Sequence, residues 1–180
     1  MEETLELPLR IESGEIVYRD PHQTVSRITA HFSGSTKEYF VSDHGERVAV
    51  LVVRCDDVLL VRQYRLQIKG ISYEVPGGRL TEGEALDIGA ARECLEESGV
   101  RCLNLQPLIS YHAGLDSWKN PTHVFLSKDC EEESDGDPER RVWVPLRRCI
   151  EMVFEGQIVD SLSIVTLLAY HTLHPVDLAP

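Results

Sequence analysis

The chain has 180 residues, of which 42% are hydrophobic, and its formal net charge is −12. This length favours one main domain with a small addition, and the hydrophobic content suffices for a core. The negative charge argues against a nucleic acid or a membrane surface as a partner. The five cysteines form no C-x-x-C pair, and we predict neither a signal peptide nor a membrane-spanning segment. We therefore expect reduced thiols and a cytoplasmic protein.

The N-terminal part of the chain alternates between apolar and polar residues. Three such alternations, near residues 16–18, 25–32 and 39–41, predict short strands that are separated by turns containing proline or glycine. We interpret them as a small antiparallel sheet. The predicted organisation is an N-terminal extension at 1–45, a main domain at 46–174 and a tail at 175–180.

The main domain begins with the apolar run Val48–Val53, which is typical of a central strand. Further strands are predicted at 58–61, 71–75, 102–111, 122–127 and 142–144. Helices are predicted at 146–154 and after Asp160, which can cap the last of them. A polar loop at 112–120 and an acidic stretch at 129–140 separate some of these elements. This mixture predicts only a domain that contains both α and β structure.

One further helix is predicted within the stretch PGGRLTEGEALDIGAARECLEESGV at 76–100. Thr81 and Glu84 have the spacing of a capping box, so the helix should start at about Glu82. Gly99 can adopt the left-handed conformation that ends it. The side expected to be buried carries Ile88, Ala91 and Leu95.

The predicted helix places Glu93, Glu96 and Glu97 within an arc of about 100°. Carboxylates at these spacings repel one another. A hard divalent cation with oxygen ligands would remove that repulsion, and Mg²⁺ can take substrate phosphates as further ligands. An acidic helix face can also be merely solvated, so the spacing of the glutamates alone leaves two interpretations open.

The same stretch resembles the Nudix box, GX5EX7REUXEEXGU, in which U is apolar. Its fixed positions are matched from Gly78 through Glu84 and Arg92 to Gly99, and Cys94 stands in the first U position. The resemblance implies an α/β (α+β) fold, an α/β/α sandwich around a mixed central sheet. It also implies hydrolysis of a nucleoside diphosphate linked to another group. The expected cofactor is Mg²⁺, with Mn²⁺ as an alternative.

The resemblance to the Nudix box implies roles for individual residues. The implied metal ligands are the backbone carbonyl of Gly77 and the side chains of Glu93, Glu96 and Glu97. Glu93 and Glu97 are therefore also counted as catalytic. Arg92 would orient the glutamates by ion pairing. Glu84 would act either as the capping carboxylate or directly on the metal.

Three further segments, VRQYR, YEVPGGRLTEGE and EGQIVDSLSIVTLL, are similar to the ADP-ribose pyrophosphatase group of the family. The similarity implies that Arg62 or Arg65 binds substrate phosphates and that Glu74 contacts metal, ribose or base. Gly114 would lie in a tight loop near the substrate. The chain departs from the group at 111–114, where Tyr-His-Ala-Gly lacks the usual proline.

The general base in this group often lies on a loop after the sheet, so the acidic run at 131–139 contains the candidates Glu133 and Glu139. A box glutamate is the alternative base. The group also implies a homodimer in which the N-terminal sheets pack across a two-fold interface. The expected substrate is a nucleoside diphosphate sugar, with ADP-ribose foremost. The alternatives are a GDP-sugar, a dinucleoside polyphosphate, or a non-catalytic module that binds a nucleotide and regulates a partner.

Overall fold

The computed structural model describes residues 6–133, 137 and 139–177. Residues 1–5, 134–136, 138 and 178–180 lie outside the described residues; they include part of the acidic run and of the expected tail. The chain forms two compact units. The first unit comprises the residues up to Gly45 together with His112–Asn120, and the second comprises Glu46–Tyr111 together with the chain from Pro121 onward. No helix in the described part is long and apolar enough to cross a membrane.

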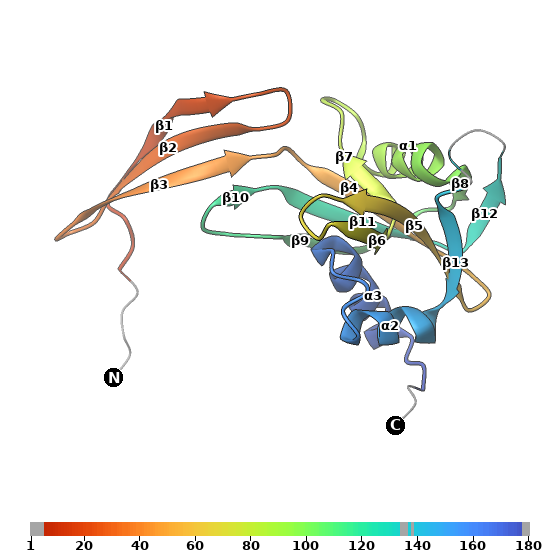
Figure 1. The fold of residues 1–180 in the computed structure, drawn as a ribbon. Helices are drawn as coiled ribbons and strands as arrows, with labels where there is room; N and C mark the ends of the chain where they lie inside the picture. The colour runs from red at the N-terminus through yellow and green to blue at the C-terminus, as the bar shows by residue number, and fades with distance from the viewer. Residues whose placement is uncertain (1–5, 134–136, 138, 178–180) are drawn as a thin grey trace. The chain divides into compact units, whose positions relative to one another are not determined.

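The first unit is a twisted sheet with the strand order β1-β2-β3-β10 in its described part (Figure 1). The strands are β1 (Arg10–Arg19), β2 (Thr24–His31), β3 (Thr36–Asp43) and β10 (Trp118–Lys119). The first three pair antiparallel and correspond to the three predicted strands, whereas β10 runs parallel to β3 and lies where a loop was predicted. Among the described apolar residues of this unit, only Ala30 is buried.

The second unit contains a mixed sheet with the order β13-β5-β4-β11-β9, in which β6 also pairs with β5 and β7 with β4. Its strands are β4 (Arg47–Arg54), β5 (Asp57–Arg65), β6 (Gly70–Glu74), β7 (Gly77–Arg79), β9 (Gln106–His112), β11 (Pro121–Ser127) and β13 (Arg141–Pro145). A separate ribbon pairs β8 (Val100–Leu103) with β12 (Asp129–Glu132). The pairing of β4 with β11 is parallel, whereas β5 is antiparallel to β4, β6 and β13.

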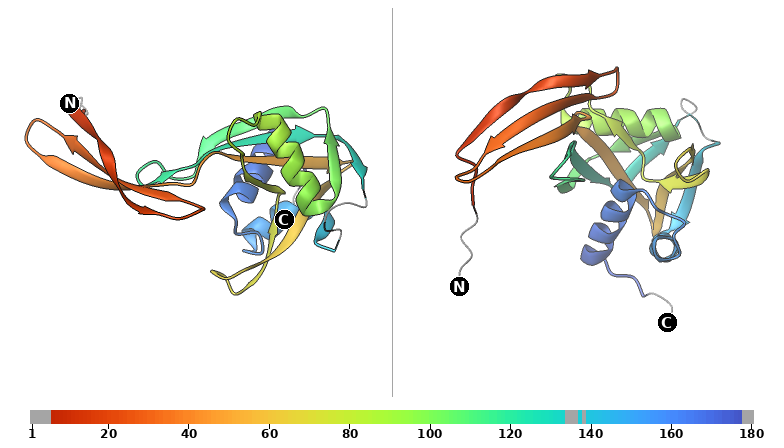
Figure 2. Two further views of the ribbon diagram at one scale, coloured as in Figure 1. Left: turned by 90° about the horizontal axis from the view of Figure 1, so that it is seen from above. Right: turned by 60° about the vertical axis from the view of Figure 1, so that its left-hand side comes forward.

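Helices cover both faces of this sheet, α1 (Leu86–Ser98) on one face and α2 (Leu146–Phe154) with α3 (Ser161–Leu173) on the other (Figures 1 and 2). The alternation of side chains along β4 explains the two cores. Val50 and Val52 pack in the core beneath α1, whereas Leu51 packs with residues of α2 and α3. The α/β/α sandwich predicted from the resemblance is therefore confirmed.

The start of α1 differs from the prediction. Glu84 N donates to Thr81 O at 3.0 Å, and Thr81 N donates to Glu84 Oε2 at 3.1 Å, so these residues form a turn before the helix. The helix begins at Leu86, and its N-cap residue Ala85 makes no side-chain capping bond. The predicted end is confirmed, because Gly99 has a φ of 67° and donates to Leu95 O.

The buried side of α1 also differs from the prediction at all three positions, because Ile88 is exposed and Ala91 and Leu95 are only partly buried. Ile88 is 60% exposed, while Gly89, Ala90 and Cys94 are buried. Small side chains on this side let the helix lie close to the valines of β4, which face it. The sheet therefore decides which side of α1 is buried. It selects the side with small residues, and the larger apolar side chain of Ile88 stays exposed.

The region after α1 contains three more strands than predicted: β10, β12 within the acidic stretch, and one that arises because the expected strand at 102–111 is divided. The expected strand at 102–111 is divided between β8 and β9, and Asn104 between them has a φ of 51°. Asparagine tolerates this left-handed conformation better than most residues. The later predictions of helices hold: α2 has the predicted bounds, and Asp160 caps α3 by accepting a hydrogen bond of 2.9 Å from Ser163 N.

Candidate active site

Arg92 connects three of the box glutamates. Its Nε and Nη2 atoms donate to the two carboxylate oxygens of Glu84 at 2.9 and 3.0 Å. Its Nη1 atom donates to Glu93 at 2.8 Å and to Glu96 at 3.2 Å. The hydrogen bonds from Arg92 are the main reason that the pKa of Glu84 falls to about 2. Arg92 thus has the contacts needed to orient these carboxylates.

Glu97 is held differently, by uncharged donors. Gln63 Nε2 donates to its Oε1 at 2.8 Å, and the backbone amide of Gly77 donates to its Oε2 at 2.9 Å. Burial of the carboxylate raises its pKa, although these two hydrogen bonds and the charge of Arg140 act in the opposite direction. Glu97 is therefore a half-buried carboxylate that the protein keeps in one orientation.

Strand β7, which precedes α1, approaches Glu93 on one side and β4 on the other so closely that it requires glycine. A Cβ atom on Gly78 would lie 2.2 Å from Glu93 Oε2. A Cβ atom on Gly77 would lie 2.5 Å from Val48 O and 2.6 Å from Ala49 Cβ. These are far below ordinary contact distances, so a larger residue would displace β7 from β4 at Gly77 or the Glu93 carboxylate at Gly78.

The two upstream arginines lie on opposite faces of β5, because side chains alternate along a strand. Gln63 and Arg65 follow Leu59 on the α1 side, whereas Arg62 follows Leu60 on the side of α2 and α3. The structure therefore does not bring the two predicted phosphate-binding residues together. It places Arg65 on the same side as the glutamine that contacts Glu97.

Arg65 forms a two-point ion pair with Glu74. Its Nε atom donates to Glu74 Oε1 at 2.7 Å, and its Nη2 atom donates to Oε2. Burial acts to raise the pKa of Glu74, but the hydrogen bonds from Arg65 and Ser72 outweigh it, so the net pKa is lowered. The two residues predicted to bind substrate are thus joined to each other at the end of β6.

The two candidates for the general base lie in different surroundings. Glu133 pairs with Arg101, and its backbone amide donates to Gly99 O at 2.8 Å, beside the C-terminal end of α1. Glu139 lies at the edge of β5, where its carbonyl accepts a hydrogen bond from Arg62. It also lines a cavity of about 270 Å³ together with Arg62, Ile71, Asp137 and Arg140.

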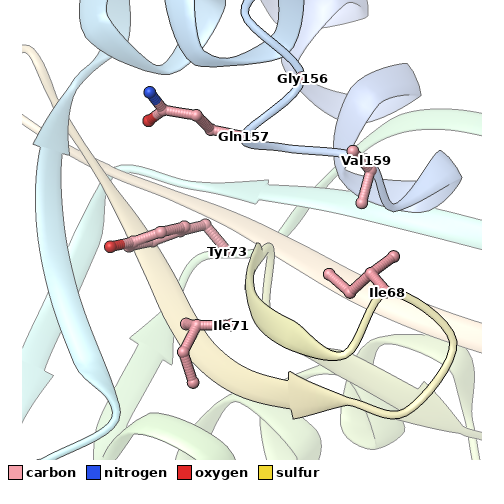
Figure 3. A pocket seen from close by; sticks show the side chains of 6 residues that line it. All are labelled: Ile68, Ile71, Tyr73, Gly156, Gln157 and Val159. Carbon is pink, nitrogen blue, oxygen red and sulfur yellow. The ribbon is translucent and has the colours of Figure 1, made fainter.

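Two further features are Gly114, which was predicted to bind substrate, and a second cavity. Gly114 belongs to the first unit, where a Cβ atom on it would meet Trp118 Cβ at 3.4 Å. A largely apolar cavity of about 390 Å³ lies between the β5–β6 turn and the connection from α2 to α3 (Figure 3). Its lining residues are Ile68, Ile71, Tyr73, Gly156, Gln157 and Val159. None of these six carries a charge, so the cavity offers no ion pair to a phosphate.

The donor set of the box suits a hard divalent cation, because it consists of carboxylates next to the backbone of β7, which carries carbonyl oxygens. Within the described residues, no three His, Cys, Asp or Glu side chains already converge as a metal cage. Arg92 contacts Glu93 and Glu96, while Glu97 faces Gln63 and Gly77. Side-chain rotation of Glu93 and Glu96 away from Arg92 would free oxygen atoms on this face for a metal.

A family model of the NUDIX domain matches residues 43–157. The chain belongs to the Nudix family. It is 30% identical to an ADP-ribose pyrophosphatase of Mycobacterium tuberculosis over 137 residues, which are 69% of this chain and 65% of the relative. It is 28% identical to a CMP-5'-(N-acetyl-N-hydroxy-3-aminopropyl)phosphonate hydrolase of Streptomyces rubellomurinus over 164 residues, 87% of this chain and 79% of the relative.

The fold of this Nudix chain also matches a crystal structure of an ADP compounds hydrolase. The TM-score is 0.76 at 20% identity, with 93% of both chains covered. Together with the Mycobacterium tuberculosis enzyme, a second ADP-ribose pyrophosphatase, from Bacillus subtilis and 26% identical over 136 residues, supports the ADP-ribose pyrophosphatase-like group. That relative covers 72% of this chain and 74% of its own length. The protein is a Nudix pyrophosphohydrolase, and such enzymes generally use a divalent metal.

One residue at the site was missed by the sequence analysis. Gln63 lies in the VRQYR segment, from which only the arginines were selected. The alternation along β5 could have placed Gln63 on the same side as Arg65. Its contact with Glu97 could not have been predicted, because it depends on how α1 packs against the sheet.

Proposed function

We propose that the protein hydrolyses the pyrophosphate bond of ADP-ribose or a related nucleoside diphosphate sugar, giving a nucleoside monophosphate and a sugar phosphate. We propose Mg²⁺ as the cofactor and Mn²⁺ as a substitute. The observation that carries this proposal is the complete Nudix box, in which Arg92 contacts Glu84, Glu93 and Glu96 beside the two glycines of β7. The ADP-ribose pyrophosphatases among its relatives support the choice of substrate.

The box residues have separate roles in this proposal. The residues that would hold the metal are the carbonyl of Gly77 and the carboxylates of Glu93, Glu96 and Glu97. A bound divalent ion would neutralise charge on the phosphates and lower the pKa of a water molecule. Arg92 would keep the carboxylates of Glu93 and Glu96 near their working positions. Glu84, which binds Arg92 at two points, would in turn hold the guanidinium in place.

Arg65 is the better of the two candidates for binding the substrate phosphates. A guanidinium group suits phosphate because it can donate two parallel hydrogen bonds. Arg65 lies on the side of β5 that faces α1, and Glu74 holds it at the end of β6. Arg62 lies on the other side of the strand and is the alternative. Gly114 would let its loop approach the sugar.

Glu139 is the better candidate for the general base. Glu133 is engaged by Arg101 beside the end of α1. Glu139 precedes Arg140, whose charge acts on Glu97, so this end of the acidic run approaches the box. The cavity that Glu139 lines also gives a substrate or a water molecule access to it.

We also propose a homodimer formed through the N-terminal extension at 1–45. This unit exposes large apolar side chains, which include Leu7, Leu9, Ile11, Ile16, Val17, Tyr18 and Phe40. An exposed apolar surface of this kind marks an interaction site in many soluble proteins. The five cysteines are free thiols, which supports our further proposal of a cytoplasmic location.

The test is kcat/KM over a panel of substrates with Mg²⁺ present. The panel contains ADP-ribose, ADP-glucose, GDP-mannose, a CMP-linked phosphonate, diadenosine polyphosphates and dGTP. We expect ADP-ribose to be preferred and to yield AMP and ribose 5-phosphate, identified by chromatography. Glu93→Gln should nearly abolish this turnover without changing the circular dichroism spectrum. A preference for dGTP or a dinucleoside polyphosphate over every diphosphate sugar would contradict the proposal, as would full activity in EDTA.

A further inference from the structure

Strand β5 supplies a side chain from outside the box that contacts a box glutamate. Gln63 Nε2 lies 2.8 Å from Glu97 Oε1, while the amide of Gly77 occupies the other carboxylate oxygen at 2.9 Å. An ionised carboxylate only accepts hydrogen bonds, so the amide nitrogen of Gln63 and not its oxygen must face Glu97. Both oxygens of Glu97 are thus held by donors from two separate segments of the chain.

The donor at this position is neutral, which separates Glu97 from the other box glutamates. Glu84, Glu93 and Glu96 each contact the guanidinium of Arg92. Within the described residues, Glu97 has no ion-pair partner. A cation that binds Glu97 would therefore not have to displace an arginine from it. Gln63 can keep its hydrogen bond to one lone pair of Oε1 while the remaining lone pairs stay available.

Gln63 is itself held in a defined place. It lies in the middle of the β5–β6 ladder, opposite the buried Ser72. Its side chain emerges on the side of the strand that faces α1, the same side as Leu59. Strand pairing fixes the backbone from which this side chain reaches out, and sites built on strands are positioned more precisely than sites on loops. The amide therefore reaches the Glu97 carboxylate from a fixed point of the sheet.

We propose that Gln63 is a positioning residue that holds Glu97 in the orientation needed to bind a divalent cation and thereby sets the affinity for that cation. The proposal rests on the proposed function, because it concerns the same metal site. Residues that orient metal ligands typically contribute about 10–100-fold to metal affinity or activity. We therefore expect loss of the amide to weaken metal binding by about 10–100-fold.

The first measurement is Mn²⁺ binding, followed by electron paramagnetic resonance with no substrate present. Gln63→Met keeps an unbranched side chain of similar length and removes the donor. We expect its dissociation constant for Mn²⁺ to rise by about 10–100-fold over the wild type. The matched control is Gln157→Met, which changes an exposed glutamine on the connection between α2 and α3 and should leave the constant unchanged.

The second measurement is amide hydrogen exchange of the protein without added metal. The amide of Gly77 is protected by Glu97, so it should exchange faster in Gln63→Met when the carboxylate is no longer held. Amides of β5 and β6 should keep their protection, because their ladder is intact. A general loss of protection over both strands, with unchanged Mn²⁺ affinity, would show a merely structural role and overturn the proposal.

These measurements separate the two proposals. A wild-type protein that binds Mn²⁺ but cleaves nothing in the substrate panel would refute the proposed function and leave the role of Gln63 to be judged by binding. A folded Gln63→Met protein with wild-type Mn²⁺ affinity would refute the role of Gln63 alone. If that variant does not fold, Gln63→Leu provides the same loss of the donor. Absence of Mn²⁺ binding by the wild type would refute both proposals.

Discussion

Replacing Gly78 by alanine should disturb the proposed metal site while leaving the rest of the fold intact. The added Cβ atom would lie 2.2 Å from Glu93 Oε2, 2.4 Å from its Cδ and 2.7 Å from its Oε1. An ordinary contact begins at 3.4 Å, so the nearest oxygen must move by about 1.2 Å. The carboxylate is the end of a side chain that can rotate. We therefore expect the glutamate side chain to move while β7 keeps its pairing with β4.

The expected loss follows from this displacement. A misplacement of about 1 Å at a reacting centre can lower the rate by about 100-fold. We expect kcat/KM for ADP-ribose to fall by about that factor and Mn²⁺ binding to weaken. The stability cost comprises the lost pairing of Glu93 with Arg92 and an unfavourable rotamer, together about 1–2 kcal/mol. For a protein of this size the Tm should fall by roughly 2–8 °C.

The assay combines steady-state kinetics, Mn²⁺ titration and thermal unfolding monitored by circular dichroism. The matched control is Gly70→Ala, because the nearest atom to its added Cβ would be Ile68 O at the ordinary distance of 3.6 Å. That variant should keep its activity. Wild-type kcat/KM and Mn²⁺ affinity in Gly78→Ala would refute the argument that β7 fixes the position of Glu93.

Three further predictions follow from the structure. Glu139→Gln should lower kcat by about 10²–10⁴-fold, as expected for loss of a general base. Glu133→Gln should have little effect on kcat. Equal rates in both variants would contradict this assignment and point to a box glutamate as the base. Pairing with Arg92 lowers the pKa of Glu84 from its ordinary 4.5 to about 2 in the folded protein. The ionised carboxylate therefore stabilises the fold above pH 4.5, and this stabilisation is lost as the pH falls from 4.5 towards 2. Glu84→Gln should flatten this part of the pH profile in urea denaturation, and an unchanged profile would contradict the pairing with Arg92. Light scattering should report about twice the chain mass, and a monomer that remains active at micromolar concentration would refute the homodimer.

Several elements could be predicted because their signals are local. The bounds of α2, the cap that Asp160 provides for α3 and the end of α1 at Gly99 depend on residues only a few positions apart. The start of α1 could not be predicted in this way. Thr81 and Glu84 have the capping-box spacing, but Arg92 binds the Glu84 carboxylate and the residues form a turn.

The sequence by itself determined the family and the glutamates that share one face of α1. The helical period alone places Glu93 and Glu97 on neighbouring turns, whatever surrounds them. Arg92, the neighbour of Glu93, could also be predicted as its partner, whereas only the tertiary structure decided which groups hold Glu97. Gln63 lies 34 residues before Glu97, and their contact requires β5 and α1 to lie together. The backbone fixes the relation between residues within a turn or along a strand, whereas sheet pairing and helix packing decide which distant side chains meet.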